Sequence, residues 1–244
     1  MERALSVATY FASDVHLRID RPERSRRFAD WVQTLKACDS LIVVGDLCDF
    51  WFASRQRGLD FRSCVGLSAA RDFVDRGGSL SIIAGNHDLW LGPFYEQALG
   101  GRFLADSLSL VTEGIKIHAI HGHLLGARSP WKGVMESRWF LDTFRRVPER
   151  LAAALEQKLD ASNDVHRARS DRRHLEVYRR YAVSLANVAE LIVLGHIHRP
   201  QDEIIGEKTR MIVLGGWILG SSRLKIADGR AEFHHESLAQ TNHN

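Results

Sequence analysis

The sequence predicts an α/β fold built around a largely parallel sheet. Two observations carry this prediction: short apolar segments rich in β-branched residues recur along the chain, and segments with helical spacing separate the first of them. The 244 residues fit one large domain, and apolar side chains make up 45% of them, enough to fill its core. We therefore expect one domain over residues 1–244, with a helical insertion at about 127–186.

The predicted strands begin near the N-terminus, where residues 6–12 form the first apolar segment. The others read SLIVVG, SLSIIAG, IKIHAIHG, ELIVLG, RMIVLGG and SSRLKIAD, at residues 40–45, 79–85, 115–122, 190–195, 210–216 and 221–228. Helices are expected at 21–38 and 61–78, and the second ends on a Gly pair that is typical of a helix stop. The last two strands follow each other closely, which indicates a second, more antiparallel sheet edge.

The insertion at 127–186 interrupts this alternation, because it contains no strand pattern. Its apolar residues lie on helical faces, and Pro148 predicts the start of a new helix. These apolar residues are Val134, Trp139, Phe140, Phe144, Leu151, Leu155 and Leu159. Residues 127–180 contain thirteen Lys or Arg and eight Asp or Glu, a net charge of +5, so the rest of the chain carries −2. The positive charge therefore lies in the insertion.

Composition excludes several classes of protein. The net charge of +3 is too small to predict nucleic-acid binding, and no such partner is expected. Three cysteines, an odd and low number, indicate a reducing compartment rather than a disulfide framework. The chain lacks an apolar run long enough to span a membrane, and its N-terminus is a poor signal peptide, so a cytoplasmic location is expected.

Polar side chains cluster directly after five of the predicted strands. The five clusters are Asp14 and His16; Asp46 and Asp49; Asn86, His87 and Asp88; His121 and His123; and His196 and His198. In open α/β sheets, ligands bind outside the carboxyl ends of the strands. We therefore expect the five loops to converge on one edge.

These residue types predict a site for two metal ions. Carboxylate, imidazole and amide oxygen suit Mn²⁺, Fe or Zn²⁺. Two cations repel each other and need a shared anionic ligand, for which Asp46 is the natural candidate. Two metals roughly 3.5–4 Å apart can clamp the attacking and leaving oxygens of a phosphoryl displacement.

The order Asp-x-His, Gly-Asp-x-x-Asp, Gly-Asn-His-Asp, His, Gly-His-x-His resembles that of the calcineurin-like metallophosphoesterases, over nearly the whole chain outside the insertion. The resemblance implies a four-layer α/β/β/α sandwich with a helical cap insertion, and a dinuclear centre whose bridging hydroxide attacks phosphorus. It also implies the ligands, which are Asp14, His16 and His198 for one metal, Asn86, His121 and His196 for the other, and Asp46 as the bridge. Two divalent ions are expected, with Mn²⁺ favoured over Fe or Zn²⁺.

The same resemblance gives His87 a catalytic role, as proton donor or transition-state stabiliser. Asn86 and His196 are expected to contact substrate as well as metal. Asp49 is expected to orient a ligand histidine by a hydrogen bond, without contacting the metal itself. Asp88 is expected to cap the following helix.

The other histidines and Cys48 are interpreted from their neighbours in the sequence. His123 is either a substrate contact or a plain loop residue. His118 and Cys48 are expected to be structural. His166 and His174 lie in the insertion and receive no role.

The segments GDLCDFWF and IVLGGWILGSSRLKIADG, with the insertion after His121, resemble the UDP-2,3-diacylglucosamine pyrophosphatases of lipid A synthesis. Those enzymes release UMP and an acylated sugar phosphate. Their main branch carries Arg at the position of His87 and Asp at that of His123, and the segment HRARSDRRHLEVYRRYA resembles a divergent branch that keeps His. In that segment Arg169, Arg172 and Arg173 are candidates for phosphate contacts.

The expected function is therefore hydrolysis of the pyrophosphate in a UDP-acylsugar. The basic, apolar insertion would hold acyl chains and contact the anionic cytoplasmic face of the inner membrane. Alternatively, its apolar residues only pack the insertion onto the domain. A phosphodiesterase or phosphatase of soluble substrates such as nucleotides is the second expectation. A non-catalytic scaffold is the third, and the complete ligand set argues against it.

Overall fold

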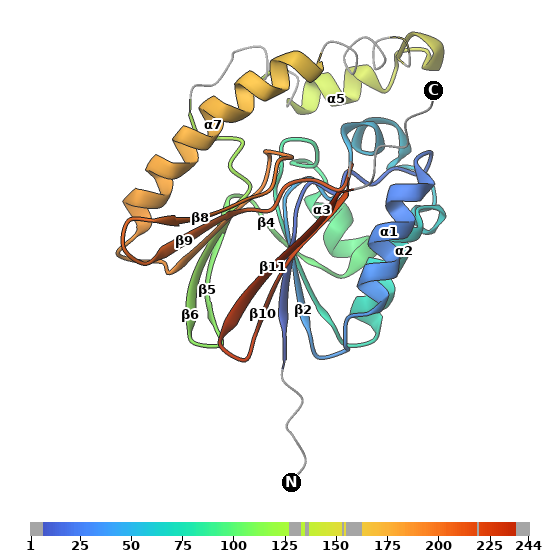
Figure 1. Ribbon diagram of the computed structural model, residues 1–244. Helices are drawn as coiled ribbons and strands as arrows, with labels where there is room; N and C mark the ends of the chain where they lie inside the picture. Colours follow the sequence, from blue (N-terminus) through green and yellow to red (C-terminus); the bar gives the residue numbers. More distant parts are fainter. Residues whose placement is uncertain are drawn as a thin grey trace, which may run out of the picture.

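The computed structural model describes residues 7–126, 133–134, 137–152, 154, 163–218 and 220–237, with the backbone alone for 163–171. Two sheets pack face to face, and helices cover their outer faces (Figure 1). The predicted four-layer α/β/β/α sandwich is confirmed.

The first sheet has six strands in the order β11-β10-β1-β2-β3-β4. Its members are β1 (Thr9–Ala12), β2 (Ser40–Val44), β3 (Ser79–Ile83), β4 (Arg102–Leu104), β10 (Gly220–Ala227) and β11 (Arg230–Ser237). Strands β1 to β4 pair in parallel, while β10 is antiparallel to both β1 and β11.

The second sheet has five strands in the order β5-β6-β7-β9-β8. Its members are β5 (Ser107–Thr112), β6 (Ile115–Ile120), β7 (Leu191–Leu194), β8 (Gln201–Ile205) and β9 (Thr209–Val213). The three central strands pair in parallel, and the two edge strands are antiparallel. The expected antiparallel character near the two closing strands is confirmed, because β9 pairs antiparallel with β8 and β10 pairs antiparallel with β1 and β11. Strands β9 and β10 belong to different sheets.

Helices α1 (Pro22–Gln33) and α2 (Val65–Asp75) cover the outer face of the six-stranded sheet (Figure 1). Both lie within the predicted helical segments, and Pro22 begins α1, where its missing N–H costs nothing. Short helical turns η1 (Phe52–Gln56), η2 (Phe61–Ser63), α3 (Gly92–Phe94) and η3 (Tyr95–Leu99) shape the loops after β2 and β3.

The core is divided into three layers of buried side chains. One lies between α1, α2 and the six-stranded sheet, and a second lies between the two sheets. The third joins the five-stranded sheet to α7 (Asn163–Leu185), with Tyr178 and Ala182 of the helix against Ile192, Met211 and Val213. The central strands are buried on both faces, which is why they read as continuous apolar segments.

In the described residues of the insertion, all regular secondary structure is helical. The insertion contains α5 (Arg138–Phe144), residues 149–152 after Pro148, and α7, which passes over one end of the sheets (Figure 1). The predicted helix start at Pro148 is confirmed. Leu155 and Leu159 lie outside the described residues. Among the described residues, no helix is long and apolar enough to cross a membrane.

Candidate metal centre

All seven predicted ligands follow the carboxyl ends of strands that point to one edge of the two sheets. Asp14 and His16 follow β1, Asp46 follows β2 and His196 follows β7, and these four have positive φ angles of 52°, 51°, 53° and 66°. For residues other than Gly this backbone conformation costs on the order of 1–3 kcal/mol. Residues with such strained backbone angles are concentrated at functional sites.

The glycines of the motifs make room for these side chains. A Cβ at Gly85 would lie 2.0 Å from Asp46 Oδ1, and one at Gly45 would lie 2.2 Å from His121 Nδ1. Gly is therefore required at both positions by close approach.

One group of predicted ligands consists of Asp14, His16 and His198. The Nε2 atoms of His16 and His198 lie 3.1 Å apart, and Asp14 Oδ1 lies 3.4 Å from His198 Nε2 and 3.8 Å from His16 Nε2. One ligand atom from each of the three lies within 4.8 Å of the other two, close enough to hold one metal ion.

The other group lies around His121. Its Nε2 is 3.3 Å from Asn86 Oδ1 and 3.5 Å from Asp46 Oδ2, and its ring centroid is 5.3 Å from that of His196. Asp46 Oδ2 is also 3.9 Å from His16 Nε2. Asp46 thus lies within reach of both groups, the position expected of a bridge.

The donor set fits divalent cations. Asp14 is fully buried, and its Oδ1 has no hydrogen-bond partner among the described residues. A buried acceptor without a donor is costly unless another positive partner satisfies it. The buried carboxylates and imidazoles of this set are the ligands that Mn²⁺, Fe and Zn²⁺ accept.

Protonation in the metal-free protein follows from the same packing. Burial acts to lower the pKa of His121, but the carboxylates of Asp46 and Asp14 raise it to about 10. Burial acts to raise the pKa of Asp46, but His121 and His87 hold it well below its usual range. Burial, then the nearby His87, keep the pKa of His16 well below its ordinary value. A cation at His121 would therefore replace a proton.

Backbone contacts hold the ligands in place. The N–H of His196 donates to Asp14 Oδ2 at 2.8 Å, and the N–H of His87 donates to Asp46 Oδ1 at 2.8 Å. His121 Nδ1 lies 2.8 Å from the carbonyl oxygen of Val44, which places the proton on Nδ1 and leaves Nε2 for a metal.

Asp88 does not cap a helix, so that prediction is wrong. Its buried carboxylate accepts hydrogen bonds from the N–H of Leu47 at 2.7 Å, the N–H of Gly85 at 2.9 Å and the Tyr95 hydroxyl at 2.8 Å. Helix α3 begins after Leu91 without a side-chain cap. Burial, then the charge of Asp46, raise the pKa of Asp88 to about 6. Asp88 therefore ties the loop after β3 to the Asp46 turn.

Asp49 accepts a hydrogen bond from the N–H of Trp51 at 2.9 Å. In the described part of the chain it makes no hydrogen bond to a predicted ligand histidine. His118 lies between the Ser109 and Tyr181 hydroxyls, 2.8 Å from each, as expected of a structural residue. Cys48 is fully buried and burial raises its pKa, which agrees with a packing role.

His87 stands at the rim of the site with 35% of its side chain exposed. Its ring centroid lies 4.7 Å from that of His16, and its Nδ1 accepts a hydrogen bond from the N–H of Phe50 at 3.1 Å. That contact places the proton of the neutral ring on Nε2, which lies 4.0 Å from Asp46 Oδ2.

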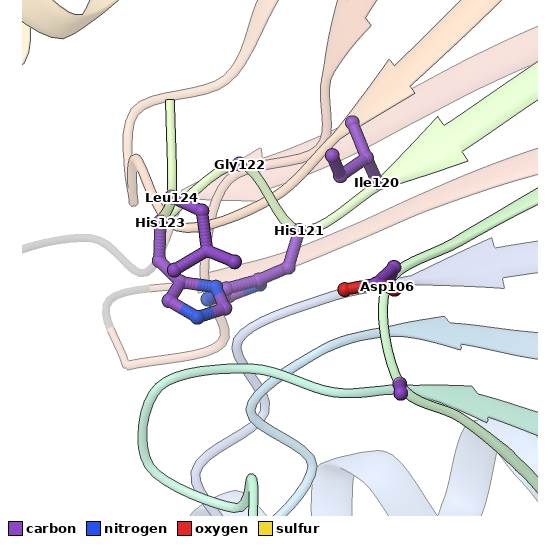
Figure 2. Close-up of a pocket in the computed structure, with 7 residues that line it drawn as sticks. Asp106, Ile120, His121, Gly122, His123 and Leu124 are labelled. Carbon is purple, nitrogen blue, oxygen red and sulfur yellow. The ribbon is translucent and has the colours of Figure 1, made fainter. Parts of the chain in front are cut away.

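His123 also joins the cluster. Figure 2 shows the rings of His121 and His123 next to each other. Both residues and Asp106 line a cavity of about 30 Å³. Arg172 and Arg173 are exposed on α7, and the side chain of Arg169 lies outside the described residues. Sequence reasoning missed His174, whose ring centroid lies 5.7 Å from that of His196.

The family model of the calcineurin-like phosphoesterases matches residues 8–200. The chain belongs to this family. It is therefore a metal-dependent phosphoesterase, and the scaffold expectation is set aside.

This calcineurin-like phosphoesterase is similar to curated enzymes over nearly their whole length. It is 26% identical to the UDP-2,3-diacylglucosamine hydrolase of Aeromonas salmonicida, with 97% of this chain and 96% of the relative covered. It is 28% identical to the enzyme of that name from Nitrosococcus oceani, over 89% and 90% of the two chains. Among solved structures, a mutant Vps29 from Entamoeba histolytica matches with a TM-score of 0.46 and 12% identity, over 96% of this chain and 100% of that one.

Proposed function

We propose that this phosphoesterase hydrolyses the pyrophosphate of UDP-2,3-diacylglucosamine, releasing UMP and an acylated sugar 1-phosphate. The observation that carries the chemistry is the position of Asp46, within 4 Å of His16 and of His121. The substrate is inferred from the names of the relatives, which align with this chain almost from end to end.

Two cations would be held by the two groups of ligands. Asp14, His16 and His198 would hold one, Asn86, His121 and His196 would hold the other, and Asp46 would serve both. When bound, they supply charge stabilisation at the phosphoryl oxygens and an activated water at neutral pH. Mn²⁺ is the proposed metal, and Fe or Zn²⁺ accept the same ligands.

His87 is the proposed catalytic residue of the protein itself. Because Phe50 occupies its Nδ1, the proton on Nε2 is available at the exposed rim, where it can hydrogen-bond a phosphoryl oxygen or leave with the departing group. Asn86 and His196 are proposed to touch substrate from the metal side. Exposed Arg172 and Arg173, with Arg169 on the same helix, are the proposed phosphate contacts from α7.

Room for an apolar substrate exists at the loop that follows β3. A cavity of about 510 Å³ has the side chains of Trp90, Phe94 and Phe103 in its wall, with Arg57 and Arg138. This volume lies in the ordinary range of small-molecule sites.

A second apolar surface lies between the cap and the domain. Phe50 packs against Phe140 and Phe144 of α5, with ring centroids 6.1 and 5.3 Å apart. The cavity lined by Trp90, Phe94 and Phe103 therefore supports acyl chains as part of the substrate, whereas the Phe50 cluster attaches α5 to the domain. Some apolar residues of the insertion therefore do pack onto the domain, as the alternative expectation held.

Other apolar residues of the cap face water. Trp139 is 71% exposed and Leu151 is 60% exposed, on a segment that carries the excess of basic residues. We propose that this surface contacts the anionic cytoplasmic face of the inner membrane, where the lipid substrate resides.

The experiment is a substrate comparison on purified protein loaded with Mn²⁺. UDP-2,3-diacylglucosamine, its deacylated form and an aryl phosphodiester are each scored for product. The proposal expects UMP from the acylated substrate and much less from the deacylated one. Equal cleavage of both forms, or cleavage of the diester alone, would favour a phosphodiesterase or phosphatase of soluble substrates and reject the proposed substrate.

A further inference from the structure

We infer that His174 of the cap helix α7 and His123 together form a subsite for the second phosphoryl group of a pyrophosphate substrate. The substrate in this inference is taken from the proposed function. The position of His174 follows from the way α7 is attached to the domain. The ring of His174 lies edge-on to that of His196, with centroids 5.7 Å apart and planes at 80°. A side chain of the insertion thus reaches the predicted metal ligands.

Tyr178 attaches α7 to the loops that carry the predicted ligands. It is fully buried, and its hydroxyl donates to the carbonyl oxygen of Gly195 at 3.1 Å. It also fills the space over Gly122, where a Cβ would lie 2.5 Å from the Tyr178 hydroxyl oxygen. One side chain therefore contacts both of the loops that carry His121 and His196.

His174 precedes Tyr178 by one helical turn. Residues four apart share a helix face, so His174 faces the same two loops. Farther along α7, Arg179 donates to both carboxylate oxygens of Glu203 at 2.8 Å, and Tyr181 hydrogen-bonds His118 at 2.8 Å. The imidazole of His174 is therefore positioned by an anchored helix rather than by a loop.

His123 is the second member of the subsite. Its ring centroid lies 5.2 Å from that of His121 and 6.3 Å from that of His196 (Figure 2 shows His123 beside His121). His123 and His174 thus both lie beside the second group of predicted ligands, while His87 stands beside His16 in the first. The resemblance assigns none of these three imidazoles to a metal.

The chemistry of a pyrophosphate matches this arrangement. It has two phosphoryl groups, and only the one under attack needs the metals. The other one carries charged oxygens that must find hydrogen-bond donors, and an imidazole has at least one N–H in either protonation state. His123 and His174 would supply these donors and favour a pyrophosphate over an ester with one phosphoryl group.

The first test compares wild-type protein with His174→Ala and His174→Gln on two substrates, UDP-2,3-diacylglucosamine and an aryl phosphodiester. Loss of a hydrogen bond to a charged group should lower kcat/KM for the pyrophosphate roughly 10- to 100-fold. Turnover of the diester should change less than about twofold, and metal content should stay the same. The matched control is His234→Ala, an exposed imidazole on β11 that should leave both activities unchanged.

The second test does not need the lipid. The affinities of Mn²⁺-loaded protein for methylenediphosphonate and for inorganic phosphate are measured by calorimetry. Wild type should prefer the diphosphonate, and His174→Ala and His123→Ala should each lose most of that preference. If wild type releases no UMP but shows this preference, the proposed substrate fails while the subsite stands.

Three outcomes overturn the subsite. One is an unchanged diphosphonate preference in His174→Ala. Another is an equal loss of turnover on both substrates, since that would mean His174 acts only by positioning His196. The third is loss of metal from His174→Ala, which would make this residue part of the metal centre.

Discussion

Asp14 Oδ2 accepts a hydrogen bond of 2.8 Å from the backbone N–H of His196, across 182 positions of the chain. Asp14 follows β1 in one sheet and His196 follows β7 in the other. One carboxylate thus joins the two sheets at the edge where the predicted metal ligands meet, while its other oxygen faces His198. One oxygen of this side chain thus supports the fold, and the other belongs to the proposed metal site.

Asp14→Asn and Asp14→Ala should separate these two roles. The Asn variant keeps an oxygen acceptor for the N–H of His196 but loses the charge, so it should fold normally and bind less metal. The Ala variant leaves that N–H without a partner and should lose about 1–3 kcal/mol of unfolding free energy as well. Metal analysis and urea unfolding of the metal-free proteins measure the two effects. An Asn variant with two retained cations would contradict the ligand assignment.

Asp46→Asn should empty both metal positions, because Asp46 is the proposed shared ligand. His198→Ala is the matched comparison, since it removes a ligand of one cation and should leave the other bound. Metal content per chain, measured by mass spectrometry after dialysis, decides between them. Two cations retained by Asp46→Asn would show that the bridge assignment is wrong.

His87→Ala should keep both cations and lower kcat by roughly 10²–10⁴, the usual range for a positioned acid or base. The reason is that His87 stands at the rim and contributes no predicted ligand atom, while its Nε2 proton faces the site. Steady-state kinetics and metal analysis of the same sample test this. Full activity, or loss of a cation, would remove His87 from its catalytic role.

Much of this site could be predicted from the sequence because its residues follow the central strands. Those strands are buried on both faces and read as continuous apolar segments, so their carboxyl ends are easy to find. The edge strands β5, β8 and β11 and the short β4 were not predicted, because nearly all of their side chains are half or fully exposed and form no continuous apolar segment.

The tertiary roles of Asp88 and His174 could not be predicted in the same way. Asp88 looks like a helix cap in the sequence, and only the fold brings the Asp46 turn and Tyr95 to its carboxylate. His174 belongs to no motif, and its position depends on the packing of Tyr178 against Gly122, which precedes Tyr178 by 56 positions in the chain.

Asp88→Ala should destabilise the fold by at least about 2 kcal/mol, because it removes the acceptor of four buried N–H groups and of the Tyr95 hydroxyl. Tyr95→Phe removes one of these donors and should cost about 1 kcal/mol. The two changes share a contact, so the double variant should lose less than their sum. Urea unfolding measures all three, and strict additivity would mean that the Tyr95 contact contributes nothing.

The attachment of α7 to β8 should weaken in acid. The hydrogen bonds from Arg179 lower the pKa of Glu203 below its ordinary 4.5. An acid whose pKa is lower in the folded state adds stability above its unfolded pKa, and that stability is lost as the pH falls through the folded value. Because the pair is partly exposed, its contribution at pH 7 is about 0.5–1 kcal/mol. Glu203→Gln should therefore melt earlier than wild type at pH 7, with a smaller difference at pH 4. In an Arg179→Ala background the same substitution should have no effect at either pH, and an undiminished effect there would show that Glu203 acts through another partner.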